Sequence, residues 1–114
     1  MAKHLDVHAR SFGTESVLLR LKGRLTFRSF QEFQRAMADH LTGRRRHVVI
    51  DLDGLSVMTV VGAAGFIAML RLLQDHQLRV EIIEPPADLL TTFEAFGVDL
   101  LLPRVFREEV PQLP

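Results

Sequence analysis

The stretch VVIDLDGLSVMTVVGAAG, residues 48–65, decides the fold of this chain. Its first half has the pattern of a buried strand, and its second half is typical of a turn followed by the start of an apolar helix. Such a junction places a short loop and a helix N-terminus at one edge of a fold, where small proteins commonly meet a partner or a phosphate. Val60 and Val61 stand where a helix start favours hydroxyl or carboxamide side chains, which cap free backbone N–H groups. The junction is therefore the first candidate for a functional site.

The composition is that of an ordinary globular domain. The chain has 114 residues, of which 47% are hydrophobic and 25% are charged. We expect a single domain over residues 1–114, with its core at about residues 16–106. Fourteen Lys and Arg balance fourteen Asp and Glu. This balance gives no overall electrostatic field that would favour binding to nucleic acid or to an anionic membrane. A net charge near zero also offers little protection against self-association, so formation of a homo-oligomer remains an open possibility.

Three features predict the compartment. The chain contains no cysteine, which excludes disulfides, thiol catalysis and thiolate metal sites and is compatible with the cytosol. The first ten residues, MAKHLDVHAR, carry no apolar run behind Lys3 and so do not resemble a signal peptide. The longest nearly apolar run, residues 57–70, is too short to span a bilayer. We therefore expect a cytoplasmic protein without membrane insertion.

Strand patterns and helical patterns alternate along the chain. Strand patterns occur at residues 4–10, 16–22, 47–52 and 80–83, followed by a short apolar stretch at 100–106. The first two predict a hairpin around Gly13. Apolar residues at helical spacing predict three helices. The first contains Phe30, Phe33, Met37 and Leu41, and the second covers residues 60–76. In the third, we expect Leu89, Leu90, Phe93 and Phe96 to face inward.

Helix boundaries can also be predicted. Ser29-x-x-Glu32 has the spacing of a capping box, Thr42-Gly43 ends that helix, and Pro86 and Gly97 bound the last one. The order of elements predicts an α/β fold with a mixed sheet of four to five strands and helices packed mainly on one face, the later strands joined by helical crossovers.

The sequence gives only weak evidence for a catalytic site or a metal site. His4 and His8 are four residues apart, but they lie in a predicted strand, where that spacing does not suit a metal pair. Asp51 and Asp53 have no His, Ser or Lys in a catalytic pattern beside them, so loop or cap duty is the better interpretation. We therefore expect a non-enzyme with no catalytic residue, no metal and no cofactor.

Two further motifs have some features of a phosphate-binding site. Residues 44–46, Arg-Arg-Arg, are typical of a solvated turn, although they could touch phosphate or steer an acidic partner. Gly62-x-x-Gly65 lacks the lysine and the glycine spacing of a phosphate loop. Small residues here more simply let a helix approach the sheet closely.

Several segments together resemble a known family. These are Gly23-Arg24-Leu25, the predicted helix from Phe30, VVIDLDGLSVMTVVG, and EPPADLLTTFEAFGVDLLLP. They are similar, in this order, to the STAS domain of bacterial anti-sigma factor antagonists and of the cytoplasmic tails of sulfate-transporter-type anion carriers. The resemblance covers residues 18–103 and implies a single-domain STAS-like fold.

The resemblance also implies a phosphorylation site that this chain has changed. In the family, the loop after the central strand commonly has Asp-Ser-Ser-Gly or Asp-Thr-Ala-Gly, and the hydroxyl after the Asp is phosphorylated by a partner kinase that is itself an anti-sigma factor. The aligned tetrad here is Thr59-Val60-Val61-Gly62. Val60 at the acceptor position has no oxygen to phosphorylate. Thr59 is either a displaced acceptor or, as we favour, the cap of the next helix, and Ser56 is a more distant candidate.

The function that the resemblance implies is a regulatory protein–protein interaction. We expect a bacterial signalling module that acts by partner switching in transcription regulation, binding a kinase-like anti-sigma factor or related signalling protein without the usual phosphorylation switch. The expected partner-binding residues are Gly23, Arg24, Leu25, Thr26, Phe27, Met58, Thr59, Val60, Val61, Gly62 and Phe66.

Three points stay open at this stage. One alternative function is the STAS accessory subunit of an ABC-type lipid transporter, bound to the ATPase, and another is a module that senses a small anion or nucleotide. The third point concerns Val60 and Val61. Either the pair fills the core, or only one of the two points inward and the other leaves an exposed apolar spot beside Met58.

Overall fold

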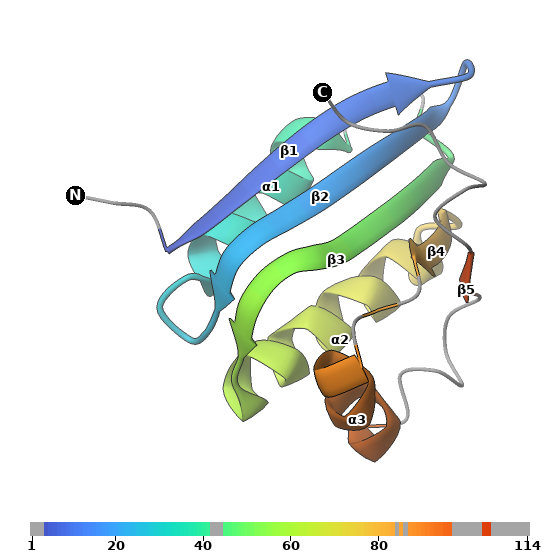
Figure 1. Cartoon of the computed structure of the whole chain (residues 1–114). Coiled ribbons are helices and arrows are strands. Elements are labelled where there is room, and N and C mark those ends of the chain that lie inside the picture. Colours follow the sequence, from blue (N-terminus) through green and yellow to red (C-terminus); the bar gives the residue numbers. More distant parts are fainter. Residues whose placement is uncertain (1–3, 42–44, 84, 86, 97–103, 106–114) are drawn as a thin grey trace.

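The computed structural model describes residues 4–41, 45–83, 85, 87–96 and 104–105. The elements follow the order β1 Leu5–Phe12, β2 Ser16–Leu25, α1 Phe30–His40, β3 His47–Met58, α2 Val60–Asp75, β4 Arg79–Ile83, α3 Ala87–Phe96 and β5 Arg104–Val105. The predicted α/β fold is confirmed (Figure 1). Gly97, Thr42-Gly43 and the apolar residues 100–103 and 106 lie outside the described residues.

A mixed sheet of five strands forms the centre of the fold. The strands lie in sequence order, β1 to β5. β1 and β2 are antiparallel, whereas the remaining neighbours are parallel pairs joined through helices. The predicted hairpin is confirmed, and Gly13 in its turn has a φ of +58°, a conformation that glycine adopts readily. Because β2 and β3 run parallel, their carboxyl ends meet at one edge of the sheet.

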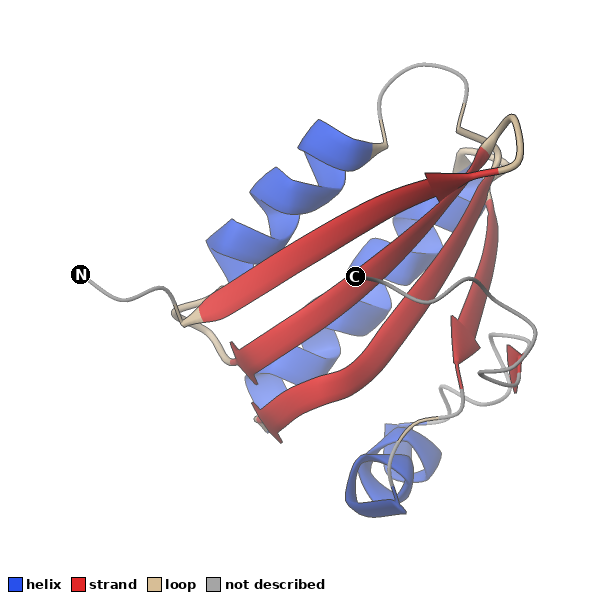
Figure 2. Ribbon diagram, turned by 45° about the horizontal axis from the view of Figure 1, so that its top comes forward, coloured by secondary structure: helices blue, strands red, loops and turns tan. Residues whose placement is uncertain are grey.

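Helices α1 and α2 cover the same face of this sheet (Figure 2). Their apolar stripes, with Phe33 and Met37 of α1 and Phe66 and Leu70 of α2, join strand residues in one core. Leu89 of α3 belongs to the same core, as its spacing predicts. A smaller cluster of Leu18, Val49 and Ile83 arises because adjacent strand residues point to opposite faces.

The main hydrophobic core includes residues before residue 16, where we expected the core to begin. Leu5 of β1 is 2% exposed and packs in this core. Its backbone N–H donates a 2.9 Å hydrogen bond to the Glu32 carboxylate of α1. The core therefore begins before residue 16, because β1 is pinned to α1 by both contacts.

Strand β3 is much longer than the predicted residues 47–52. It continues to Met58, because residues 54–58 pair with the end of β2, after register shifts at Arg20/Lys22 and Gly23/Arg24. Such irregularities bend strands, and both strands curve toward this end in Figure 1. The expected turn inside residues 48–65 is therefore wrong: Thr59 alone separates β3 from α2.

Candidate functional site

The junction between β3 and α2 is built around Thr59. Its backbone is extended, and its Oγ1 accepts a 3.1 Å hydrogen bond from the backbone N–H of Gly62. This is the geometry of a helix N-cap, so the capping role that we favoured for Thr59 is confirmed. The backbone N–H of Thr59 donates to the carbonyl oxygen of Leu25 at 3.1 Å, which ties the start of α2 to the end of β2.

Val60 and Val61 occupy the first turn of α2 and point away from the core. Their exposed fractions are 68% and 56%. The alternative in which the pair fills the core is wrong, and both valines, rather than one, form the apolar spot. The inward positions of this turn belong instead to Gly62 and Ala63, which are buried.

Gly62 allows the helix to approach the sheet. A β-carbon at this position would overlap the carbonyl oxygen of Leu25 and would lie 2.7 Å from the carbonyl carbon. At Gly65 a β-carbon would lie 2.5 Å from the Phe30 ring. The prediction that small residues let this helix approach the sheet closely is confirmed at Gly62, whereas Gly65 allows close packing on Phe30 of α1.

The loop between β2 and α1 faces this helix start and is held by Ser29. The buried Ser29 hydroxyl donates to the carbonyl oxygen of Arg24 at 2.7 Å and accepts from the backbone N–H of Thr26 at 2.8 Å. The predicted capping box is therefore wrong. Ser29 makes no side-chain cap bond to α1, and Glu32 bonds to Leu5 instead. The Ser29 hydroxyl bonds to the loop and not to the helix, because the loop supplies both a donor, the N–H of Thr26, and an acceptor, the carbonyl oxygen of Arg24, within five residues.

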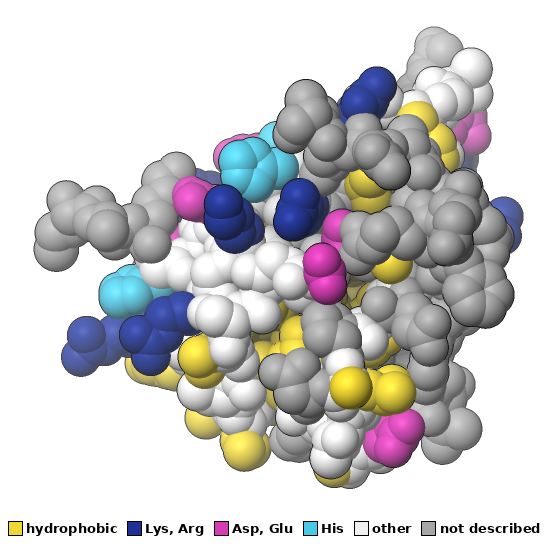
Figure 3. All heavy atoms as spheres, in the orientation of Figure 1, with side chains coloured by type: hydrophobic (Ala, Val, Ile, Leu, Met, Phe, Trp, Pro, Cys, Tyr) yellow, Lys and Arg dark blue, Asp and Glu magenta, His cyan; other side chains and the backbone are white. Residues whose placement is uncertain are grey.

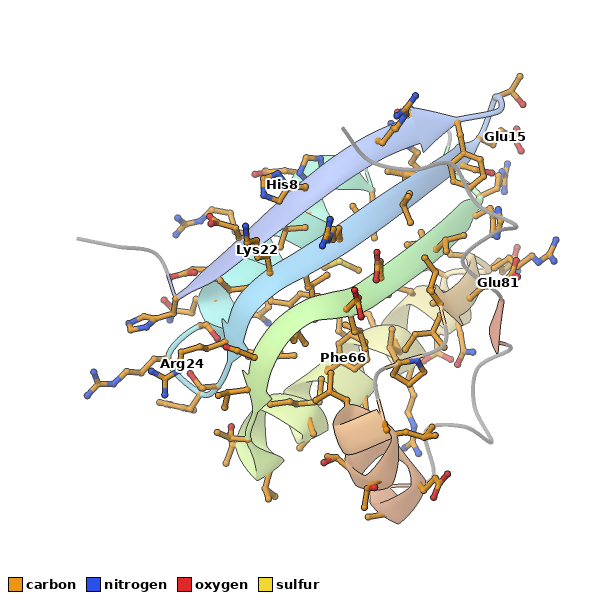
Figure 4. All side chains as sticks on the ribbon, in the orientation of Figure 1. His8, Glu15, Lys22, Arg24, Phe66 and Glu81 are labelled. Carbon is orange, nitrogen blue, oxygen red and sulfur yellow. The ribbon has the colours of Figure 1, made fainter. Side chains whose placement is uncertain are left out.

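Phe27 lies at the tip of this loop and is 77% exposed. An open hollow of about 540 Å³ separates the loop from α2. Its lining residues are His4, Arg24, Thr26, Phe27, Arg28, Thr59 and Val61. Figure 3 shows basic and histidine side chains beside hydrophobic ones where β2 and β3 end and α2 begins, and Figure 4 places Arg24 there. We call the exposed residues Arg24, Phe27, Arg28, Thr59, Val60 and Val61 the loop–helix surface.

Several expected partner-binding residues do not reach this surface. Leu25, Gly62 and Phe66 are buried, so they lie beneath this surface and not on it. They position the surface from beneath. Gly23 and Met58 are half-buried, and Gly23 has a φ of +114° and packs against the carbonyl oxygen of His4.

A second polar cluster, missed in the sequence, lies at the opposite end of the strands. The hydroxyl of Ser16 is 3.0 Å from Nδ1 of His47, whose Nε2 is 2.5 Å from the carboxylate of Glu81. Arg79 Nε is 3.0 Å from the same carboxylate oxygen. Phe12 packs edge-on to the His47 ring, with centroids 6.0 Å apart. No local spacing in the sequence predicts this cluster, because its residues lie far apart in the chain on β2, β3 and β4. Figure 4 labels Glu81, the member on β4.

The other polar residues singled out in the sequence have structural positions. His8 is an exposed strand residue. Asp51 is buried within β3 and accepts a 2.9 Å hydrogen bond from the backbone N–H of Asp53, so neither lies in a loop. Arg45 bonds to the carbonyl oxygen of Ser16 at 3.1 Å, which favours a structural turn over a phosphate site at the described end of the arginine run.

The described part of the chain shows neither a metal-binding cluster nor a membrane-spanning helix. There, no three His, Asp or Glu side chains come together in a group that could hold a metal ion. Among the same residues, every helix is too short or too polar to cross a bilayer.

Comparison with known proteins points to one family. The family model described as "Mlab, STAS domain" matches residues 8–103. No curated protein matches the sequence significantly.

Solved structures share the fold at low sequence identity. The anti-sigma factor antagonist SpoIIAA in its unphosphorylated form superposes with a TM-score of 0.72 at 18% identity, over 91% of each chain. The phosphorylated form of SpoIIAA from Bacillus gives 0.68 at 18% identity, over 91% of this chain and 95% of that one. An anti-sigma factor antagonist from Mycobacterium paratuberculosis gives 0.75 at 12% identity, over 94% and 89%.

Proposed function

The chain belongs to the STAS domain family, and from this premise we propose that it is a non-enzymatic regulatory module that binds a protein partner through the loop–helix surface. The proposed partner is a kinase-like anti-sigma factor or a related signalling protein. The fold shared with anti-sigma factor antagonists supports this class of function. The partner's contact with this surface is our proposal.

One observation carries the proposal. Among the described residues, four large hydrophobic side chains are exposed, and three of them, Phe27, Val60 and Val61, belong to the loop–helix surface. Phe27 and Val61 line the same hollow, and Val60 precedes Val61 at the start of α2. Exposed apolar side chains gathered in one place mark sites of protein interaction, whereas single ones are ordinary. The fourth, Leu72, stands alone near the other end of α2 and provides a matched control.

The second part of the proposal is that a phosphate on residue 60 does not regulate this binding. Valine at this position cannot accept a phosphoryl group. A phosphate at this helix start would add about −1.5 to −2 charge. The Thr59 hydroxyl accepts the N–H of Gly62, which supports a capping role rather than a displaced switch. Regulation through the amount of partner would replace the kinase.

The polar cluster of Ser16, His47 and Glu81 does not change the proposal of a non-enzyme. Glu81 is shared with Arg79, and the His47 ring is covered by Phe12. We assign the cluster a structural role, since it links the beginnings of three strands.

Affinity capture with the tagged chain from its native cell tests this proposal. We expect recovery of a kinase-like anti-sigma factor, with no phosphate on Thr59 or Ser56 by mass spectrometry. A Val60→Ser variant tests whether a cognate kinase still docks, because only a docked kinase would label the restored hydroxyl. Recovery of a transporter ATPase would overturn the proposal in favour of a transport subunit, and phosphate on Thr59 of the wild-type chain would overturn the lost switch.

A further inference from the structure

We infer that the partner docks through an acidic segment, in which an apolar side chain packs on Phe27, Val60 and Val61 and flanking carboxylates pair with Arg24 and Arg28. This inference rests on the proposed function, because it specifies the chemistry of the partner at the same surface.

The charge of the hollow is the first argument. Two of its lining residues, Arg24 and Arg28, are positively charged, and none of the lining residues is acidic. Fourteen basic residues balance fourteen acidic ones in the whole chain. The positive character is therefore a local property of this site. Complementary charge steers partners and selects among them.

The two guanidinium groups are available for a partner. Arg24 and Arg28 are both exposed. Among the described residues, no ion pair and no hydrogen bond joins the side chain of Arg24 or Arg28 to another group. Arginine is well suited to this use, because its planar group can bind a carboxylate through two parallel hydrogen bonds.

The size of the apolar part is the second argument. A stable interface covers about 800 Å² on each partner, whereas one aromatic side chain buries about 150–250 Å². Phe27 and two valines are therefore too small to form a stable interface alone, and the contact has to include the surrounding rim. Because Arg24 and Arg28 line the same hollow, a partner that covers this rim meets both guanidinium groups, and carboxylates on the partner would complement them.

The start of α2 adds charge of the same sign. A helix N-terminus carries a positive partial charge, which acidic residues in the first turn commonly complement. The first turn of this 16-residue helix contains no acidic residue. Carboxylates from the partner would complement both the helix end and the arginines.

The loop that presents these groups is held in position before binding. Ser29 bonds to both Arg24 and Thr26, and the backbone N–H of Arg24 donates to the carbonyl oxygen of His4 at 2.8 Å. A preorganised loop loses little conformational freedom on binding, which lowers the free-energy cost of forming the contact.

Three fluorescent peptides test the inference against the full chain. They share one Leu-Phe-Leu centre, flanked on both sides by Glu, Gln or Lys, and their binding is measured by anisotropy at low and high salt. We expect the Glu peptide to bind roughly threefold to tenfold more tightly than the Gln peptide, and the Lys peptide to bind most weakly. High salt should remove most of this difference.

Charge reversal on the protein provides the matched comparison. Arg24→Glu with Arg28→Glu should reverse the preference between the Glu and Lys peptides. Arg35→Glu with Arg71→Glu, an equal charge change at two exposed helix positions, should leave the order unchanged. At residue 60, affinity for the Glu peptide should follow the order Val60→Lys, Val60→Gln, Val60→Glu, since the three changes remove the same apolar contact and differ in charge.

The outcomes separate this inference from the proposed function. Equal binding of the three peptides, lost in Val61→Asp, would overturn the acidic segment and leave the surface as a docking site. Binding that survives Val61→Asp and the Arg24/Arg28 reversal would overturn both. Absence of binding by every peptide, or retention by phosphatidylglycerol vesicles with no binding of the Glu peptide, would also overturn the acidic protein segment.

Discussion

The carbonyl group of Leu25 and the α-carbon of Gly62 approach each other so closely that no side chain fits between them. A β-carbon at Gly62 would lie 2.7 Å from the carbonyl carbon of Leu25. The same carbonyl oxygen accepts the N–H of Thr59. The end of β2 and the start of α2 are thus held together, and the two exposed parts of the loop–helix surface keep a fixed relation.

Gly62→Ala should destabilise the protein by about 1–3 kcal/mol, because the added carbon meets backbone that cannot move aside. This loss exceeds the gain of at most about 1 kcal/mol from the higher helix propensity of alanine. Gly65→Ala is the comparison, since its added carbon meets the ring of Phe30, a side chain that can turn. Urea denaturation measures both. Equal stabilities of the two variants would contradict the account.

Thr59→Ala should lower the free energy of unfolding by about 0.5–2 kcal/mol, because the N–H of Gly62 loses its capping oxygen. Thr59→Ser keeps the hydroxyl and should recover most of the loss. Thermal unfolding of the three proteins checks this prediction. A serine variant as unstable as the alanine variant would show that the hydroxyl does not cap α2.

Ser29→Ala should affect both stability and partner binding. The buried hydroxyl satisfies the N–H of Thr26 and the carbonyl of Arg24, and leaving such groups unpaired costs about 1–3 kcal/mol each. We also expect weaker binding, because the loop that presents Phe27 is no longer fixed. Ser56→Ala, which removes an exposed 3.1 Å bond to Gly23, is the control and should change both quantities little. Calorimetry for folding and titration for binding separate the two effects.

Glu81→Ala should destabilise the protein by about 1–3 kcal/mol, because the largely buried carboxylate that His47 and Arg79 share is removed and the ring of His47 is left without this partner. The matched variant Arg79→Ala removes a side chain that is 72% exposed and should cost under about 1 kcal/mol. Chemical denaturation measures these losses. Partner affinity of the folded Glu81→Ala protein should be unchanged, since the cluster lies at the other end of the strands.

Much of the fold was predictable because its signals are local. The spacing of Phe33 and Met37, the turn at Gly13 and the cap at Thr59 each depend on neighbouring residues, and the structure confirms them. The end of β3 was not predictable in this way. Asp53-Gly54 is typical of a turn, but the register shifts against β2 allow the strand to continue through it.

The candidate site was predictable only in part, for a related reason. The tetrad at residues 59–62 indicated the valines, but their exposure depends on how α2 packs on the sheet, where Gly62 is in close contact with the carbonyl group of Leu25. Ser29 and Glu32 have the spacing of a capping box, yet Ser29 bonds to the backbone of Arg24 and Thr26, and Glu32 bonds to the backbone of Leu5. The cluster of Ser16, His47 and Glu81 depends entirely on the order of strands.

The most direct test of the central claim compares Val60→Asp with Leu72→Asp in affinity for the captured partner. Both changes place a carboxylate on an exposed apolar position of the same helix, 68% and 49% exposed in the wild type. We predict that Val60→Asp weakens binding at least about tenfold, because it puts an unpaired charge into the interface, while Leu72→Asp binds as the wild type does. Unchanged affinity of Val60→Asp, or an equal loss in both variants, would contradict the assignment of the loop–helix surface as the docking site.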